Sequence, residues 1–526
     1  MRSRRRQACE GCHARKSRCL PGNSADTCKR CEENDLSCEA HEARTRRRKI
    51  PRKELRFVDV ASKLQATSEH SFGHELLVAL QVQAVSPSKW PALETLTHER
   101  GQELCEHYRR LATAVPFAIY PSSVAPQKLL STSPILLLSI ILSASSSCLE
   151  LERHCEDIFR HTLADRVIIK GQRSLELLQS LLTYLIWYPH RFDPSTQQYY
   201  QFLQLALGMA ADLGLYKQFK HGKFAQAIND LNTVRTFLLC YYLGCGCGIL
   251  GFDRPDVMRC VEKLRAAAGV LAEGSDNPLD KEAPAIVELM HIVAQQWDCL
   301  SSTDTARLAS LDSTTSQEMW RTAHYRSTLS SATKSSYHFI SAYSIIKSAG
   351  YRSLPAQKIG TCVDHLVALL SNVLDQDISY LFFLGGVEWG HVLTSLFLLP
   401  KLETSLPVKS TEPRTAPLTF QHVGDFRNLL HKIRSETDTN STLNAPHFSD
   451  WIEKILAAVE KQTISRLRSP TADAGLNNEE TAHELVNSFV DDGKHDGSHT
   501  NGNTRHLQEL GTEDFWTDFM SDWLHW

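Results

Sequence analysis

Between residues 100 and 468, apolar residues recur every three or four positions, which is the spacing of one face of an α-helix. One such stripe stops before Pro189 and consists of Leu175, Leu178, Leu182 and Leu185. A second stops at Gly214 and consists of Phe202, Leu205, Met209 and Leu213. Proline and glycine are common helix terminators. The pattern therefore predicts a large all-α region without convincing strands, with both stripes in its core.

The best candidate for a membrane span runs from Leu129 to Leu149 and contains no charged residue. Eight of its 21 residues are Ser or Thr, and Pro134 interrupts it. Because a span needs about 20 predominantly apolar residues, we expect a buried core helix here and no membrane as a partner. The charged N-terminus is not followed by an apolar run, so no secretory signal peptide is expected.

Charge is divided unevenly along the 526 residues. Residues 1 to 53 hold 16 Lys and Arg against 7 Asp and Glu, whereas the remaining residues hold 41 against 53. A basic arm on an acidic body is typical of a protein that binds nucleic acid or another anionic surface. The length suggests two to four domains at about 150 residues each.

Six of the 15 cysteines lie within the first 38 residues, as one C-x2-C-x6-C unit that occurs twice. They are Cys9, Cys12, Cys19, Cys28, Cys31 and Cys38. Zn²⁺ prefers four sulfur or nitrogen ligands, and six thiolates fill the eight positions of two ions if two thiolates bridge both metals. A short segment with few apolar side chains cannot fold by burial alone, so the metal would supply the folding energy. We therefore expect two zinc ions per chain.

Two other uses of six cysteines are disfavoured by the sequence. A secreted disulfide knot is disfavoured because no signal peptide is expected and because the spacing repeats. A thiol-rich metal store would not need arginine and lysine between its ligands, yet this segment has them at Arg15, Lys16 and Arg18.

The residues ACEGCHARKSRC (8–19), followed by the second C-x2-C-x6-C unit (28–38), resemble the fungal binuclear zinc cluster transcription factors. The resemblance implies a small zinc-organised module of two helices in which Cys9 and Cys28 bridge the metals. One ion would then take Cys9, Cys12, Cys19 and Cys28, and the other Cys28, Cys31, Cys38 and Cys9. The chain departs from the family pattern at Asp26, where proline is usual, and at Ser17, which is usually aliphatic; Pro21 stands earlier in the loop.

The same resemblance assigns roles to the basic residues of the first unit. Guanine presents O6 and N7 in the major groove, and arginine or lysine is suited to both acceptors. Lys16 would read a CGG-like triplet of double-stranded DNA, Arg15 would lie beside it, and Arg18 would contact phosphate.

A second basic run extends from Arg44 to Lys53 and includes Arg46, Arg47 and Arg48. These charges would neutralise DNA phosphates without reading sequence, or would serve as a nuclear import signal. Only about one heptad of apolar spacing follows, formed by Leu55, Val58, Ala61 and Leu64. A homodimer through a coiled coil is therefore left open, because three or four heptads would be expected.

Three stretches of the middle region resemble the regulatory middle homology region of the same family. They are residues 166–192, 201–216 and 240–256. Within the last, Gly246 to Gly251 matches the dinucleotide motif G-x-G-x-x-G but follows a helical pattern instead of a strand, so no such site is expected. Cys245 and Cys247 are expected to be core thiols. No catalytic motif is found, so we do not expect an enzyme.

The C-terminal part changes composition twice. Residues 469–511 have the composition of a disordered, solvated linker. The last fifteen residues then hold five aromatic residues, four acids and no Lys or Arg. Helical spacing aligns Phe515, Phe519 and Trp523, which suggests an amphipathic activation segment that folds on a coactivator. The alternative is a terminal helix docked on the protein's own core.

Together these patterns predict a nuclear, zinc-dependent transcription factor, with an activator favoured. The expected divisions are a DNA-binding module at 1–53, a linker at 54–99, an α-helical regulatory domain at 100–468, a linker at 469–511 and an activation segment at 512–526. Alternatives left open are a repressor with the same DNA module, and an enzyme or small-molecule receptor fused to a zinc module. A small-molecule effector is also left open.

Overall fold

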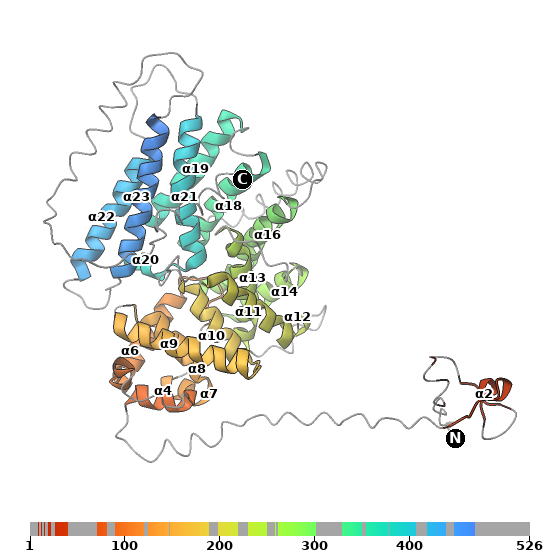
Figure 1. Cartoon of the computed structure of the whole chain (residues 1–526). Helices are drawn as coiled ribbons and strands as arrows, with labels where there is room; N and C mark the ends of the chain where they lie inside the picture. Colours follow the sequence, from red (N-terminus) through yellow and green to blue (C-terminus); the bar gives the residue numbers. More distant parts are fainter. Residues whose placement is uncertain are drawn as a thin grey trace, which may run out of the picture. The chain divides into compact units, whose positions relative to one another are not determined.

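The computed structural model divides the chain into two compact units, Met1–Lys63 and Leu64–Trp526 (Figure 1). Within them it describes residues 9, 12, 15, 19–22, 27–39, 71–81, 90–119, 125–146, 148–188, 198–218, 230–249, 258, 261–300, 329–349, 354–376, 378–406, 418–437 and 446–468.

The second unit is a body of helices around one continuous hydrophobic core. Its first elements are α4 (Phe72–Leu80), α5 (Pro91–Glu94), α6 (His98–Ala112), α7 (Pro126–Thr132), α8 (Pro134–Ala144), α9 (Leu149–Leu163), the π-helix η3 (Ala164–Ile169), α10 (Leu175–Ile186), α11 (Tyr199–Leu213) and α12 (Leu215–Gln218). They are followed by α13 (Leu231–Ile249), α14 (Val261–Gly274), α15 (Pro278–Lys281), α16 (Ala283–Leu300), α18 (Ser331–Ala349), α19 (Ala356–Leu374), α20 (Ile378–Phe383), α21 (Gly386–Ser405), α22 (Leu418–Thr437) and α23 (Pro446–Arg468).

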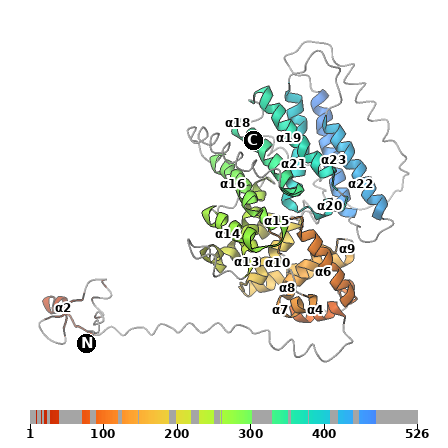
Figure 2. The same ribbon diagram turned by 180° about the vertical axis from the view of Figure 1, so that it is seen from behind.

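The helices of the body form two groups that share the core. Figures 1 and 2 show α18, α19, α21, α22 and α23 side by side at one end and the helices from α4 to α10 at the other. Helices α13, α14 and α16 lie between the groups, and α13 packs on both α10 and α21. The described residues of the body contain helices and no strand, which confirms the all-α prediction.

The apolar stretch from Leu129 to Leu149 is a core element, as expected. Pro134 occupies the first turn of α8, where its missing N–H costs nothing, and every residue of α8 is buried. Among the described residues, no helix combines the length and apolarity that crossing a bilayer requires.

The two predicted stripes differ in their outcome. Helix α10 is buried on nearly all sides, so its leucine stripe is part of the core. In α11 the buried face is rotated from the predicted one: Leu203, Ala206, Leu207 and Ala210 are buried, while Phe202, Leu205 and Leu213 are only partly covered. Met209 of the stripe is buried as well, and the other three residues pack against the core, so the stripe does face the core. The most deeply buried face lies beside it, because apolar residues occupy more than one face of this helix. Gly214 ends α11 in the left-handed conformation, with φ of 66°, as the pattern predicted.

The segment expected as a linker at 54–99 includes part of the core. Phe72 and Leu76 of α4 are fully buried in the same cluster as α8 and α10. A Cβ on Gly73 would lie 1.6 Å from the Leu93 carbonyl oxygen, so glycine allows α4 to approach α5. The helical body therefore begins at or before Phe72 and not at residue 100.

The G-x-G-x-x-G match begins inside a helix and serves packing. Gly246 lies in α13, where a Cβ would stand 2.4 Å from a methyl carbon of Val387 in α21. The absence of a side chain lets the two helices pack closely. Cys245 is buried beside it, as expected of a core thiol.

A buried ion pair joins α13 to α15. The side chains of Arg235 and Asp280 are 6% and 3% exposed, and Nη2 of the arginine lies 2.5 Å from Oδ2 of the aspartate. Ser275 adds to the network, since its hydroxyl donates to Oδ2 of Asp280 and accepts from Arg235. This connection is not visible in the sequence pattern.

Candidate metal centre

The second cysteine unit is built around α2 (Lys29–Glu33). Cys28 is the residue before the first turn, with extended backbone, and Cys31 faces inward from the helix. The loop before α2 is closed by an isolated antiparallel bridge between Pro21 and Cys28. The amide of Lys29 also donates to the Leu20 carbonyl at 2.9 Å. Pro21 thus takes part in loop closure in a chain that lacks proline at position 26.

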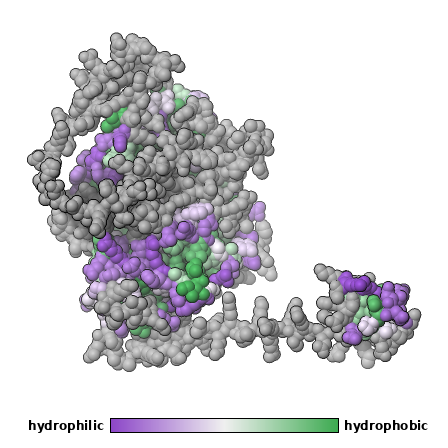
Figure 3. Space-filling view, viewed as in Figure 1, coloured by the Kyte–Doolittle hydropathy of each residue, from purple (hydrophilic) through white to green (hydrophobic). Residues whose placement is uncertain are grey.

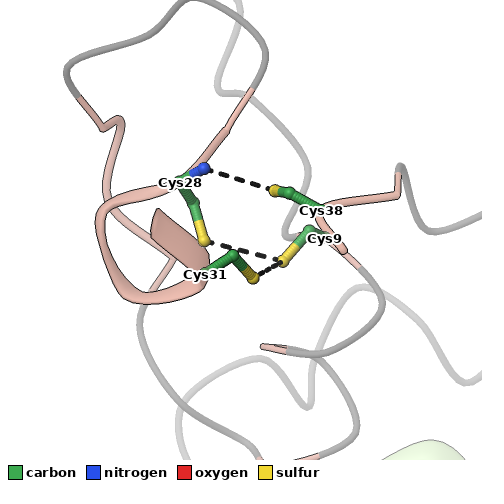
Figure 4. A group of neighbouring side chains, drawn as sticks. All are labelled: Cys9, Cys28, Cys31 and Cys38. Carbon is green, nitrogen blue, oxygen red and sulfur yellow. Dashed lines mark hydrogen bonds between the residues drawn. The ribbon is translucent and has the colours of Figure 1, made fainter. Parts of the chain in front are cut away.

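The thiols of the module converge on one another (Figure 4). The Sγ atoms of Cys9 and Cys28 are 3.8 Å apart, as are those of Cys9 and Cys31, and those of Cys12 and Cys28 are 3.7 Å apart. A disulfide requires about 2.05 Å, so these contacts are not disulfides. With zinc–sulfur bonds of about 2.3 Å, the edge of a tetrahedron of thiolates is about 3.8 Å. The separations therefore fit thiolates that share a zinc ion.

The six cysteines form two groups of four ligands. The first group is Cys9, Cys12, Cys19 and Cys28, and the second is Cys9, Cys28, Cys31 and Cys38; in each group the sulfur atoms lie within 4.8 Å of one another. Cys9 and Cys28 belong to both groups, as two bridging ligands would. Among the described residues, no other cluster of His, Cys, Asp or Glu has metal-binding geometry.

Hydrogen bonds lower the pKa of the shared thiol Cys28. The backbone N–H of Cys31 is the main cause, and the thiols of Cys31 and Cys12 add to it, lowering the pKa of Cys28 to about 6. Proton sharing with Cys28 raises the pKa of Cys31 above its usual value. A bridging ligand must be a thiolate, so the local hydrogen bonds favour the form of Cys28 that a metal needs.

The buried thiols of the body behave in the opposite way. Burial raises the pKa of Cys105 to about 12 and that of Cys362 to about 11. These cysteines therefore stay protonated at neutral pH, and neither belongs to a metal-binding group. The contrast is with the shared thiol Cys28, since the pKa of the ligand thiols Cys19 and Cys31 is also raised.

Most of the residues predicted to contact DNA lie outside the described residues. Arg15 is described and is exposed in a turn after Cys12. The other predicted contacts and the predicted activation residues lie outside the described residues: Lys16, Arg18, Arg46, Arg47, Arg48, Phe515, Phe519 and Trp523. The same holds for the heptad from Leu55 to Leu64.

Part of the chain is similar to two fungal transcription factors. The chain is 27% identical over 224 residues to transcription factor himD of Aspergillus japonicus, covering 40% of this chain and 37% of that protein. It is 28% identical over 223 residues to transcription factor opdL of Penicillium oxalicum, covering 40% of this chain and 39% of that protein. No family model and no solved structure matches the chain. The two fungal relatives and the paired cysteine groups confirm the resemblance of this chain to the fungal binuclear zinc cluster transcription factors.

Proposed function

We propose that this chain is a nuclear, sequence-specific transcription factor that binds double-stranded DNA through a cluster of two zinc ions and six cysteines. The observation that carries the proposal is the pair of four-thiol groups that share Cys9 and Cys28. The first ion is assigned to the group with Cys12 and Cys19, and the second to the group with Cys31 and Cys38. Bound zinc would hold the module folded.

In each cysteine unit a short segment lies between the second and the third cysteine. These two segments carry opposite charges, which supports one orientation of the module on DNA. In the first unit this segment contains Arg15, Lys16 and Arg18 and no acid. In the second it contains Glu32, Glu33 and Asp35, all exposed. Phosphates attract the first segment and repel the second. The first unit is therefore the one proposed to enter the major groove.

Replacing Lys16 with alanine is expected to weaken binding to CGG-containing duplexes by about 1–3 kcal/mol, with little effect on random DNA. The reason is that base edges carry sequence information and phosphates do not. Fluorescence anisotropy with both duplexes measures the difference. Lys29→Ala is the matched control, because Lys29 is an exposed lysine of the acidic unit. Equal losses on specific and random DNA for Lys16→Ala would contradict base reading.

Replacing Arg46, Arg47 and Arg48 with alanine is expected to weaken binding to all duplexes alike. Each phosphate contact releases counterions, so the slope of log affinity against log salt should become shallower. A salt titration of binding to specific and random duplexes provides the measurement. A loss restricted to CGG-containing DNA would assign these residues to base reading instead.

We propose an activating role for residues 512–526. Fused to an unrelated DNA-binding domain, this segment is expected to switch on a reporter gene. Phe515, Phe519 and Trp523 would fill a coactivator groove, while the acids keep the rings in solution and steer the encounter. Replacing these three rings with alanine should abolish the signal, and replacing Asp514, Asp518 and Asp522 with asparagine should only reduce it.

A silent fusion would contradict the activating role. If the fusion instead lowered reporter expression, the chain would be a repressor with the same DNA module. The proposal includes no catalytic activity; turnover of a metabolite by the purified full chain would contradict that part of it.

A further inference from the structure

The loop that joins the two cysteine units is held closed by backbone hydrogen bonds. The amide of Lys29 donates to the carbonyl of Leu20 at 2.9 Å, and the amide of Gly22 donates to the carbonyl of Thr27 at 3.0 Å. These are the two bonds that flank one residue pair of an antiparallel β-ladder. We call residues 20–22 and 27–29 the loop bridge.

The pair between these two bonds consists of Pro21 and Cys28. It is a non-hydrogen-bonded pair, in which the backbone N–H of each residue points away from the facing strand. Proline has no N–H, so position 21 accepts it without loss of a bridge bond. The N–H of Cys28 points outward for the same reason, and it donates to Sγ of Cys38 at 3.3 Å (Figure 4). The loop bridge thus aims an N–H group of one ligand cysteine at the sulfur of another.

This geometry connects the loop bridge to both four-thiol groups. Cys28 belongs to both groups, Cys19 of the first group directly precedes the loop bridge, and Cys38 of the second receives the N–H of Cys28. Hydrogen bonds to metal ligands orient the ligands, and losing such a partner typically costs about 10–100-fold in metal affinity.

Apolar burial does not supply this orientation. Figure 3 shows that the described surface of the module is largely hydrophilic on the face in view, with a small apolar area. The buried side chains in the described part of the module are all cysteines. The backbone bonds of the loop bridge are therefore the contacts that hold the two units in register.

Gly22 allows α2 to lie against the loop bridge. A Cβ at this position would stand 2.4 Å from Oε2 of Glu32 and 2.9 Å from the carbonyl oxygen of Thr27. The carboxylate is the end of a flexible side chain and can move, whereas the Thr27 carbonyl is backbone and accepts the bond from the Gly22 amide. A side chain at position 22 would therefore strain the loop bridge itself.

We propose that the loop bridge is a positioning element of the zinc cluster, which places Cys19, Cys28 and Cys38 for the two ions. The inference rests on the proposed function, because it concerns the affinity for zinc. Apart from Cys28, the residues of the loop bridge are not ligands and act through the cysteines. Their loss should therefore lower the zinc affinity and leave the number of bound ions unchanged.

The first experiment removes the N–H of Lys29. Lys29 is the first residue of α2, where proline is well tolerated, and Cys28 before it already has the extended backbone that a following proline requires, with φ of −91° and ψ of 151°. Lys29→Pro therefore deletes the bond to Leu20 and spares the helix. Lys29→Ala is the matched control, since it loses the same charge and the same contact with Glu33 but keeps the N–H.

Competition with a chelating dye measures the zinc affinity of the full chain. Lys29→Pro is expected to bind zinc about tenfold or more weakly than Lys29→Ala, while saturating zinc still gives two ions per chain. Cobalt(II) provides a second readout, because its charge-transfer band with thiolates depends on the geometry and hydrogen bonding at the sulfur atoms. This band should shift in Lys29→Pro and not in Lys29→Ala.

Equal zinc affinities and equal cobalt spectra for the two variants would overturn the inference. Complete loss of zinc binding by Lys29→Pro would also overturn it, since the loop bridge would then be required for the fold and not for positioning. An unaltered chain that binds no zinc would overturn the proposed function as well, so the two failures are distinguishable.

A second set of variants tests the contact at Gly22. Gly22→Ala is expected to weaken zinc binding about tenfold. Adding Glu32→Ala should restore part of the affinity, because the atom nearest to the new Cβ is removed while the Thr27 carbonyl remains. Adding Glu33→Ala instead is the matched control, since Glu33 is an exposed acid of the same helix and the charge change is identical. Equal recovery by both acids would mean that charge decides the affinity, and it would overturn the role of Gly22.

Discussion

Removal of zinc is expected to unfold the region from Cys9 to Cys38 and to abolish specific DNA binding. The described residues buried in this unit are all cysteines, and among the described residues they form its only buried cluster. Structural zinc sites contribute about 10–16 kcal/mol of apparent binding free energy in small domains, which is also their folding free energy. Metal analysis of the purified chain should give two zinc ions, and chelation should eliminate binding to CGG-containing DNA. Restoring zinc should restore the binding.

Serine substitutions test the sharing of ligands. Cys28→Ser removes a ligand from both four-thiol groups and should reduce the zinc content toward zero, whereas Cys12→Ser removes a ligand from one group only. Cys148→Ser is the matched control, since Cys148 is an exposed free thiol of the body. A single zinc ion per chain, or DNA binding that survives complete chelation, would contradict the shared-ligand arrangement.

Replacing Asp280 with alanine is expected to destabilise the helical body by about 3–5 kcal/mol, because it leaves the Arg235 guanidinium buried without its counter-charge. Arg235 keeps only neutral partners, such as the side chain of Asn232 at 2.8 Å. Urea unfolding followed by helical circular dichroism would measure the loss as a lower midpoint.

The exposed pair between Arg265 and Glu288 is the matched control. It has the same arginine and carboxylate chemistry, with side chains 41% and 26% exposed. Glu288→Ala is expected to cost less than about 1 kcal/mol, because water solvates the remaining arginine. Combining Asp280→Ala with Arg235→Met should recover part of the stability, since no charge is then left buried. A double variant less stable than Asp280→Ala alone would show that the arginine stabilises by packing.

Glu388 is a second buried acid, and the sequence pattern does not indicate that it is buried. Glu388 of α21 is 5% exposed and accepts a hydrogen bond from the Tyr242 hydroxyl of α13. Burial raises the pKa of Glu388, so the side chain holds its proton to higher pH than an exposed glutamate would. The two residues are 146 positions apart, and no local rule connects them.

The sequence by itself indicated which cysteines gather into a candidate metal-binding cluster and the helical class of the body. These features depend on short-range spacing: a C-x-x-C pair brings two thiols together within one turn, and an apolar residue every three or four positions marks a helix. The repeated unit and the resemblance that it carries placed Cys9 and Cys28 as the shared ligands. The structure gives the same two groups.

Only the tertiary structure decided which helices share the core, which face of α11 is buried and where charge is enclosed. Phe72 lies in the predicted linker but is fully buried, and Arg235 lies in a helix whose partner Asp280 is 45 residues away. Ile168 and Ile169 are apolar and yet exposed, in the π-helix η3. The same physical reason explains why the sequence pattern did not indicate these three features. Burial is fixed by contacts between segments distant in the chain, and local periodicity carries no information on which segments meet.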